Sequence, residues 1–185
     1  TSPKWAYGLD FGLDNPSAII KVTLSGDKLY AEEKLYKSGL TNSDIIAYLS
    51  HQERGDIYAD PSAKQMITEI QRAGFSAFPG IKGVKESIDL MRRQTILIPQ
   101  ESTNFIKEIQ NYCWKKDRNA MGEDAYLPEP VKFRDHAMDA LRYAGWGIVT
   151  KYGFPTQQAR PTEAIKSLTF GANQDKVLAR WLKRG

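Results

Sequence analysis

Residues 4–36, KWAYGLDFGLDNPSAIIKVTLSGDKLYAEEKLY, hold the pattern that decides the fold. Residues 4–10 are apolar and aromatic, residues 17–24 are rich in β-branched side chains, and residues 29–36 alternate apolar with charged side chains. All three patterns are typical of strands. Glycine, proline and short polar residues separate the runs and mark tight turns. We therefore expect a three-stranded antiparallel meander at the start of the chain.

After the meander, the spacing of apolar residues changes to that of helices alternating with short strands. Strands that are joined through helices run parallel to one another in a single sheet. The sequence therefore predicts an α/β domain with a central mixed sheet, three antiparallel strands followed by parallel strands, and helices on both faces. Short strands are expected at 56–59, 75–78 and 96–98, a loop or hairpin at 115–132, and a long helix at 134–149.

The composition is that of one compact domain. The chain has 185 residues, of which 41% are hydrophobic, so it can bury a substantial core. A single cysteine excludes a disulfide framework and a cysteine-based zinc site. No apolar run approaches the length of a membrane span, and no signal peptide opens the chain, so we expect no membrane partner.

The charge divides the chain into two parts. Residues 151–185 contain seven Lys and Arg against two acidic residues, whereas residues 1–150 are almost neutral. We expect a globular domain at 1–150 and a basic tail or linker at 151–185. Within the tail, Val177, Leu178, Trp181 and Leu182 predict a short amphipathic helix.

Two aspartates follow predicted strands. Asp10 ends an apolar strand and is flanked by glycines, where a buried carboxylate needs a cation or metal to neutralise it. Asp60 ends the strand at 56–59 and precedes Pro61. Each has a simpler interpretation: Asp10 can be a turn residue, and Asp60 can be the N-cap of the following helix.

A third acidic motif lies at the start of the long helix, RDHAMDALRY at 134–143. On a helix, Asp135 and Asp139 share a face, and His136 lies three residues before Asp139. Carboxylates with an imidazole at this spacing suit a hard divalent cation. The alternative is a polar helix face with an Asp135–Arg142 or Arg134–Asp135 charge network.

Together the three motifs, GLDFG at 8–12, YADPS at 58–62 and DHAMDALRY at 135–143, resemble the nuclease domain of tailed-phage large terminase subunits. The resemblance spans about residues 4–150 and implies a ribonuclease H-like fold. It also implies an endonuclease that cuts concatemeric duplex DNA during packaging, in the host cytoplasm. The catalytic residues carried over are Asp10, Asp60, Asp139 and His136, and Asp135 is a further candidate metal ligand beside the three aspartates.

The implied cofactors are two divalent cations, Mg²⁺ or Mn²⁺, held by the aspartates about 4 Å apart, with Asp10 as the bridging ligand. The resemblance also implies that the family's ATPase motor domain would precede this one. The chain contains no P-loop motif, so by itself we expect it to cut DNA but not to hydrolyse ATP for translocation. The procapsid portal is an expected partner of the tail.

Basic residues between the acidic motifs are candidates for contacts with DNA phosphates, which position a duplex without reading its sequence. Lys82 is the first choice because Gly80 and Gly83 permit close approach of a backbone. For each of them, the alternative is a solvated surface charge. The candidate residues are Lys82, Lys85, Arg92, Lys115 and Lys116.

Three other functions remain open at this point. An actin-like or sugar-kinase-like ATPase shares an Asp-x-Gly turn, seen here at 10–12, but such proteins need two lobes. A Holliday-junction resolvase would share the fold and the metals and differ in substrate. A catalytically inactive interaction module would use the same acids as caps and surface charges.

Overall fold

The structure is a computed structural model that describes residues 4–26, 28–118, 124–132, 134–153 and 176–178. Its elements, in chain order, are β1 (Lys4–Asp10), β2 (Ser17–Ser25), β3 (Lys28–Lys37), α1 (Asn42–Ser50), β4 (Asp56–Ala59), α2 (Lys64–Arg72), β5 (Ala77–Pro79), α3 (Val84–Arg92), β6 (Thr95–Pro99), α4 (Thr103–Asn111), β7 (Trp114–Arg118), β8 (Asp124–Pro130), α5 (His136–Tyr152) and β9 (Lys176–Leu178). Among these residues, no helix is both long enough and apolar enough to cross a bilayer.

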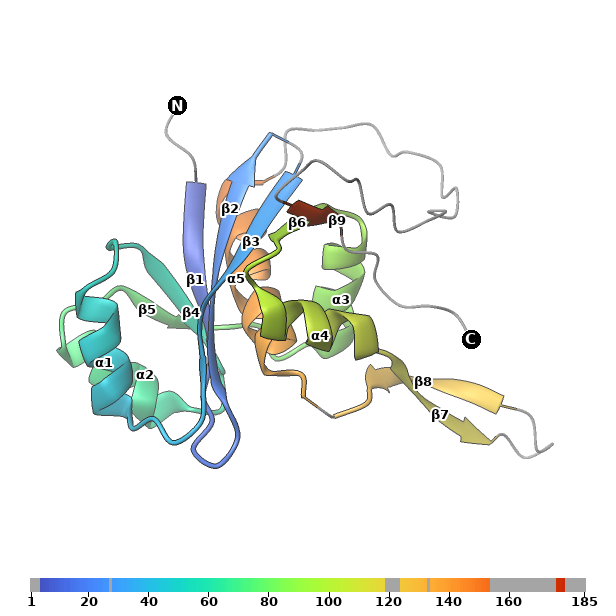
Figure 1. The fold of residues 1–185 in the computed structure, drawn as a ribbon, viewed down its shortest axis with the longest axis horizontal. Coiled ribbons are helices and arrows are strands. Elements are labelled where there is room, and N and C mark those ends of the chain that lie inside the picture. Colours follow the sequence, from blue (N-terminus) through green and yellow to red (C-terminus); the bar gives the residue numbers. More distant parts are fainter. Residues whose placement is uncertain (1–3, 27, 119–123, 133, 154–175, 179–185) are drawn as a thin grey trace.

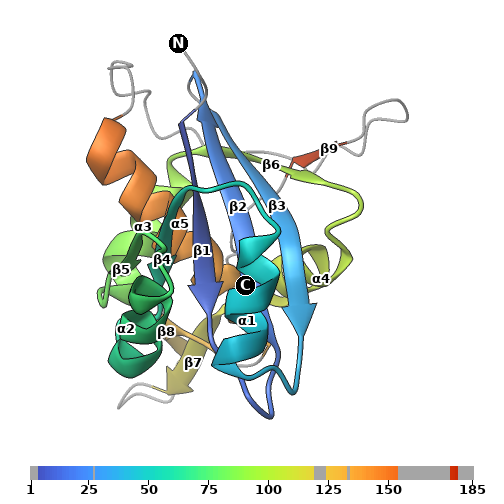
Figure 2. The same ribbon diagram turned by 90° about the vertical axis from the view of Figure 1, so that its left-hand side faces the viewer.

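The described strands form a mixed sheet of order β5-β4-β1-β2-β3-β6-β9 and a separate β7-β8 hairpin. Strands β1, β2 and β3 are antiparallel neighbours, which confirms the predicted meander. Strand β4 pairs parallel to β1, β5 parallel to β4, and β6 parallel to β3. Helices α1 and α2 cover one face of this sheet, and α3, α4 and α5 lie on the other (Figures 1 and 2). The predicted α/β architecture is confirmed.

Strand β1 separates two hydrophobic cores because successive side chains of a strand point to opposite faces. Tyr7 and Leu9 pack in the core beneath α1 and α2, whereas Ala6 packs in the core beneath α5. Asp10 lies four residues after Ala6 on the same strand, so its side chain points to the same face of the sheet, the face covered by α5. The alternation of β1 therefore aims the carboxylate of Asp10 at helix α5.

Helix α5 approaches β1 closely because both surfaces are built from small residues. A Cβ atom at Gly8 would overlap the carbonyl group of Ala140, so only glycine permits this crossing. Ala137 and Ala144, one turn on either side of Ala140, are fully buried in the same contact. This packing brings the amino-terminal end of α5 next to the carboxyl end of β1.

The structure corrects the prediction for part of the tail. Val177 and Leu178 lie in strand β9, which pairs antiparallel with β6, and not in an amphipathic helix. Trp181 and Leu182 lie outside the described residues.

Candidate active site

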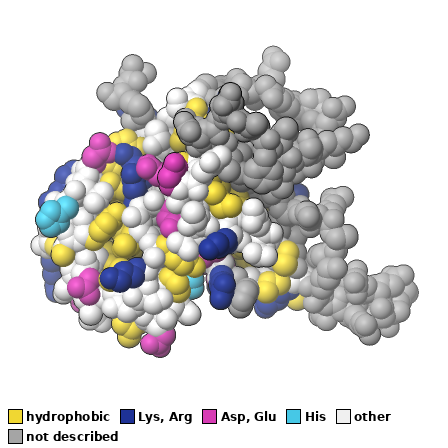
Figure 3. Space-filling view, viewed as in Figure 1, with side chains coloured by type: hydrophobic (Ala, Val, Ile, Leu, Met, Phe, Trp, Pro, Cys, Tyr) yellow, Lys and Arg dark blue, Asp and Glu magenta, His cyan; other side chains and the backbone are white. Residues whose placement is uncertain are grey.

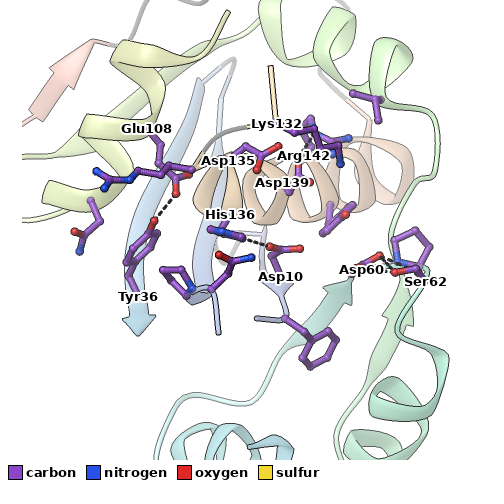
Figure 4. Close-up of a pocket in the computed structure, with 18 of the residues that line it drawn as sticks. Asp10, Tyr36, Asp60, Ser62, Glu108, Lys132, Asp135, His136, Asp139 and Arg142 are labelled. Atoms are coloured by element: carbon purple, nitrogen blue, oxygen red, sulfur yellow. Dashed lines mark hydrogen bonds and ion pairs between the residues drawn. The ribbon is translucent and has the colours of Figure 1, made fainter. Parts of the chain in front are cut away.

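A cavity of about 1180 Å³ opens where the carboxyl ends of β1 and β4 meet the amino-terminal end of α5. Its lining brings together residues that are more than 120 positions apart in the sequence, as the close-up in Figure 4 shows. All five acidic-motif residues predicted from the sequence contribute to this lining: Asp10, Asp60, Asp135, His136 and Asp139.

Asp10 is a buried carboxylate at the centre of the sheet, only 7% exposed. Its Oδ2 lies 2.9 Å from Nδ1 of His136. The pKa of Asp10 is raised to about 6, mainly by burial and also by the negative charges of Asp139 and Asp60, while the hydrogen bond from His136 opposes the rise. Burial and the neighbouring carboxylates thus disfavour the ionised form of Asp10, and a cation bound beside it would stabilise that form.

His136 is oriented by this contact with Asp10. The hydrogen bond to Asp10 raises the pKa of His136 above its ordinary value, although partial burial opposes the rise. When Asp10 is ionised, Nδ1 carries the proton and donates it, so Nε2 is the ring nitrogen available to accept another. The geometry thus leaves His136 able to take up a proton at Nε2.

Asp139 is held by the guanidinium of Arg142, which lies one helical turn further along α5. Nη2 and Nε of Arg142 donate to the same oxygen, Oδ1, at 2.5 and 3.1 Å. Arg142 is buried, and its Nη1 donates to Oγ of Ser87 on α3 at 2.8 Å. The predicted alternative in which Arg142 pairs with Asp135 is wrong, since Arg142 binds Asp139 instead.

Asp135 occupies the N-cap position of α5, yet its side chain makes no capping hydrogen bond. Its Oδ2 is buried and has no hydrogen-bond partner among the described residues. Burial raises the pKa of Asp135, and the charge of Asp139 raises it further. An orphaned carboxylate oxygen of this kind is suited to a cation, because a buried acceptor without a partner is otherwise destabilising.

Asp60 does not cap a helix, which corrects the alternative drawn from the Asp-Pro pair. Helix α2 begins at Lys64, and its N-cap residue is Ala63. The carboxylate of Asp60 instead accepts from the backbone N–H and the hydroxyl of Ser62, each at 2.8 Å. Asp60 therefore closes a local turn after β4, and Figure 4 shows its side chain directed at Ser62.

The donor types in this cavity fit hard divalent cations, which prefer carboxylate oxygens. As the side chains lie, no group of three or more His, Cys, Asp or Glu in the described residues forms a ready metal shell. Asp60 engages Ser62, and Asp139 engages Arg142 through one oxygen only. The backbone thus places the aspartates around one cavity, while the carboxylates of Asp60 and Asp139 are engaged by other protein groups.

The predicted DNA-contact residues separate into two sets. Lys82 is in the first set, which lines the cavity. The second set lies on other elements: Lys85 and Arg92 are on α3, outside the lining, and Lys115 and Lys116 are on strand β7 of the hairpin. The face seen in Figure 3 carries scattered Lys and Arg side chains with acidic ones among them. The structure adds three basic residues to the cavity lining that the sequence analysis did not name: Lys64, Lys107 and Lys132.

Sequence reasoning also missed Glu108, a cavity-lining residue of α4 that is only 4% exposed. Burial raises its pKa to about 7, against hydrogen bonds from Tyr36 and the backbone of α5 that lower it. The sequence does contain an indication of this residue, because Glu108 lies between Phe105 and Ile109 on the buried stripe of its helix. An acid within an apolar helical stripe indicates a specific partner.

A family model described as the terminase RNase H-like domain matches residues 10–145. Among solved structures, the nuclease domain of the large terminase g2p from bacteriophage SPP1, with bound Mn, superposes with a TM-score of 0.65 at 22% identity, covering 78% of this chain and 86% of that one. The P22 large terminase nuclease domain has a TM-score of 0.57 at 20% identity, with 81% of each chain covered. No curated protein matches this chain significantly.

The large terminase of a thermophilic bacteriophage is similar over 80% of this chain, with a TM-score of 0.62 and 23% identity. This chain spans 39% of the length of that protein. At these identities the superpositions show a shared fold.

Proposed function

Because this chain belongs to the terminase RNase H-like domain family, we propose that it is a metal-dependent endonuclease that cuts concatemeric phage duplex DNA during genome packaging. The observation that carries the proposal is the gathering of four aspartates and a histidine around one cavity, with Asp10 buried in its lining. An ionised Asp10, buried beside other carboxylates, is unfavourable unless a cation binds there.

We assign the metal ligands to Asp10, Asp60 and Asp139, with the unpartnered oxygen of Asp135 as an additional donor. Two Mg²⁺ or Mn²⁺ ions, when bound, supply an activated water and stabilise the departing 3′ oxygen of the cleaved phosphodiester. The bound Mn of the SPP1 nuclease domain supports the use of a divalent cation. The all-oxygen donor set supports the same class of ion.

The protein's own groups prepare this chemistry. Above pH 6 Asp10 is ionised and accepts from His136, which fixes the ring and leaves Nε2 to take up a proton. Arg142 fixes Oδ1 of Asp139 and leaves that carboxylate anchored within the cavity. Lys82 lines the cavity, which supports its proposed contact with a DNA phosphate.

We further propose that an ATPase motor domain accompanies this domain in the intact polypeptide. The large terminase of the thermophilic bacteriophage supports this, since this chain spans 39% of its length and it has been solved in complex with ADP and with ATP-gamma-S. The sequence of this chain contains no P-loop. Cutting and ATP-driven translocation would then belong to different domains.

Nicking of supercoiled plasmid tests the proposal directly. The wild-type protein is expected to cut plasmid of any sequence with Mn²⁺ or Mg²⁺ and to be inactive in EDTA, because phosphate contacts carry no sequence information. Asp139→Asn keeps the shape of the side chain and removes its charge, so it should be inactive under all conditions.

Three results would contradict the assignment. Cutting that persists in EDTA would refute the dependence on metal, and absence of cutting with any divalent cation would favour an inactive interaction module. Cleavage confined to four-way junctions, with linear and supercoiled duplexes untouched, would identify a resolvase instead.

A further inference from the structure

The amino-terminal end of helix α5 is capped by a carboxylate from a different helix. The first backbone N–H groups of a helix have no acceptor within it. The N-cap residue Asp135 does not supply one through its side chain. Instead Oε2 of Glu108 on α4 accepts from the backbone N–H of Ala137 at 2.7 Å and of Met138 at 3.1 Å.

Glu108 is itself held in place from a third element. The hydroxyl of Tyr36 on β3 donates to Oε1 of Glu108 at 2.6 Å, a contact drawn in Figure 4. Both oxygens of the carboxylate are thus engaged, and the residue is 4% exposed. A short, charge-assisted bond at each oxygen leaves this side chain little freedom to rotate.

The start of α4 is anchored to the same strand by an equivalent contact. Oε2 of Glu33 on β3 accepts from the backbone N–H of Phe105 at 2.8 Å, and its Oε1 accepts from the side chain of Asn104 at 2.8 Å. Strand β3 therefore fixes α4 through Glu33, and α4 fixes α5 through Glu108. These carboxylate contacts link β3, α4 and the amino-terminal end of α5.

The two amides held by Glu108 lie in the helical turn that carries the site. Ala137 and Met138 stand between His136, which contacts Asp10, and Asp139, which contacts Arg142. A carboxylate at this end of a helix also interacts favourably with the helix dipole. Loss of the cap would let the first turn fray and move both site residues relative to Asp10.

We propose that Glu108 is a positioning residue of the active site, which holds His136 and Asp139 over Asp10 by capping helix α5. The inference rests on the proposed nuclease function for its catalytic consequence and on the capping geometry for its structural part. Displacement of catalytic groups by about 1 Å can reduce the rate of a reaction by about 100-fold.

Three variants separate positioning from general stability. Glu108→Ala removes the cap. Glu108→Gln preserves it, because the amide oxygen can accept from the two N–H groups and the amide nitrogen can donate to Tyr36. Thr41→Ala is the matched control, since Thr41 caps α1 on the opposite face of the sheet through a capping box with Asp44.

Amide hydrogen exchange and plasmid nicking are measured for each variant at a temperature at which circular dichroism shows that variant to be folded. Glu108→Ala is expected to speed exchange at Ala137 and Met138 by about tenfold or more. Its turnover should fall by about tenfold or more, with KM for DNA unchanged. Glu108→Gln should keep the exchange rate and the turnover at their wild-type values. Thr41→Ala should lower only the melting temperature.

Unchanged exchange at Ala137 and Met138 in Glu108→Ala, or faster exchange with unchanged turnover, would overturn the proposal. If wild-type protein does not cut DNA at all, the proposed function fails separately. The role of Glu108 is then tested by Mn²⁺ binding. Glu108→Ala should raise the Mn²⁺ concentration at half-saturation about tenfold, whereas Thr41→Ala should not. Equal Mn²⁺ binding in all three proteins would overturn it.

Discussion

Replacing Asp10 by asparagine should stabilise the protein at pH 8 in metal-free buffer. Asp10 is 7% exposed and has the charges of Asp139 and Asp60 nearby. Asparagine has almost the same shape and retains an oxygen that can accept from Nδ1 of His136. The substitution therefore removes the buried charge and preserves the packing.

The magnitude follows from the pKa of Asp10, which burial raises from 3.8 to about 6 in the folded protein. Each pKa unit corresponds to about 1.36 kcal/mol, so ionising Asp10 destabilises the folded state by ~3 kcal/mol. Because the folded pKa is the higher one, this destabilisation is absent below pH 3.8, grows as the pH rises toward 6, and is complete above that. The gain from Asp10→Asn should therefore be full at pH 8 and vanish near pH 4.

Thermal unfolding in EDTA at pH 8 and at pH 5 measures this effect. For a chain of this size, ~3 kcal/mol corresponds to an increase in melting temperature of roughly 6–12 °C. Asp56→Asn is the control. Asp56 lies on the neighbouring strand β4, pairs with Lys151 of α5 at 2.5 Å, and is not part of the cavity lining. That variant should lose at most about 1 kcal/mol, as expected for a surface ion pair.

A lower melting temperature for Asp10→Asn than for wild type at pH 8 would refute the reasoning. A gain of the same size at pH 5 and pH 8 would also refute it, since the effect would then not come from ionisation. Added Mn²⁺ provides a further check, because it should raise the melting temperature of wild type and leave that of Asp10→Asn unchanged.

Two further predictions concern Asp60 and Lys82. Asp60→Asn should fold with a free energy of unfolding within about 1 kcal/mol of wild type, because asparagine can still accept from Ser62. Its plasmid cutting should fall on the order of 100-fold or more as a charged metal ligand is lost, and near-normal cutting would show that Asp60 only closes its turn. Lys82→Ala should weaken DNA binding equally for all sequences and lower the slope of log affinity against log salt by about one, whereas Lys85→Ala, on α3 outside the cavity, should leave that slope unchanged. Equal slopes for both variants and wild type would assign Lys82 to the solvated surface.

The sheet and the long helix α5 could be predicted from the sequence because their patterns are local. The meander is visible as three strand-like runs separated by turn residues, and α5 as small apolar residues at helical spacing. The same patterns located the acidic residues at the ends of strands and at the start of a helix. They also predicted the parallel pairing of β4 with β1, which places Asp10 and Asp60 at one edge of the sheet.

The side-chain partners could not be predicted in the same way. Asp135 and Arg142 are seven residues apart, about 10 Å along a helix, so Arg142 instead binds Asp139 at three residues. The Asp-Pro pair at Asp60 has the composition of a helix cap, yet the chain makes a Ser62 turn before α2 begins. In the first case the partner is one that the sequence analysis did not name, and in the second short-range geometry chose between two alternatives that the sequence left open.

The sequence by itself therefore determines the order of the strands and helices and the positions of the acidic residues along them. It can do so because backbone preferences and hydrophobic periodicity act over a few residues. The tertiary structure decides which of those acids are buried, and with that the raised pKa of Asp10 and the unpartnered oxygen of Asp135. It also decides that Glu108 caps α5 from another helix. These properties depend on removal from water and on contacts across more than 25 positions of the chain, which only the packed fold brings about.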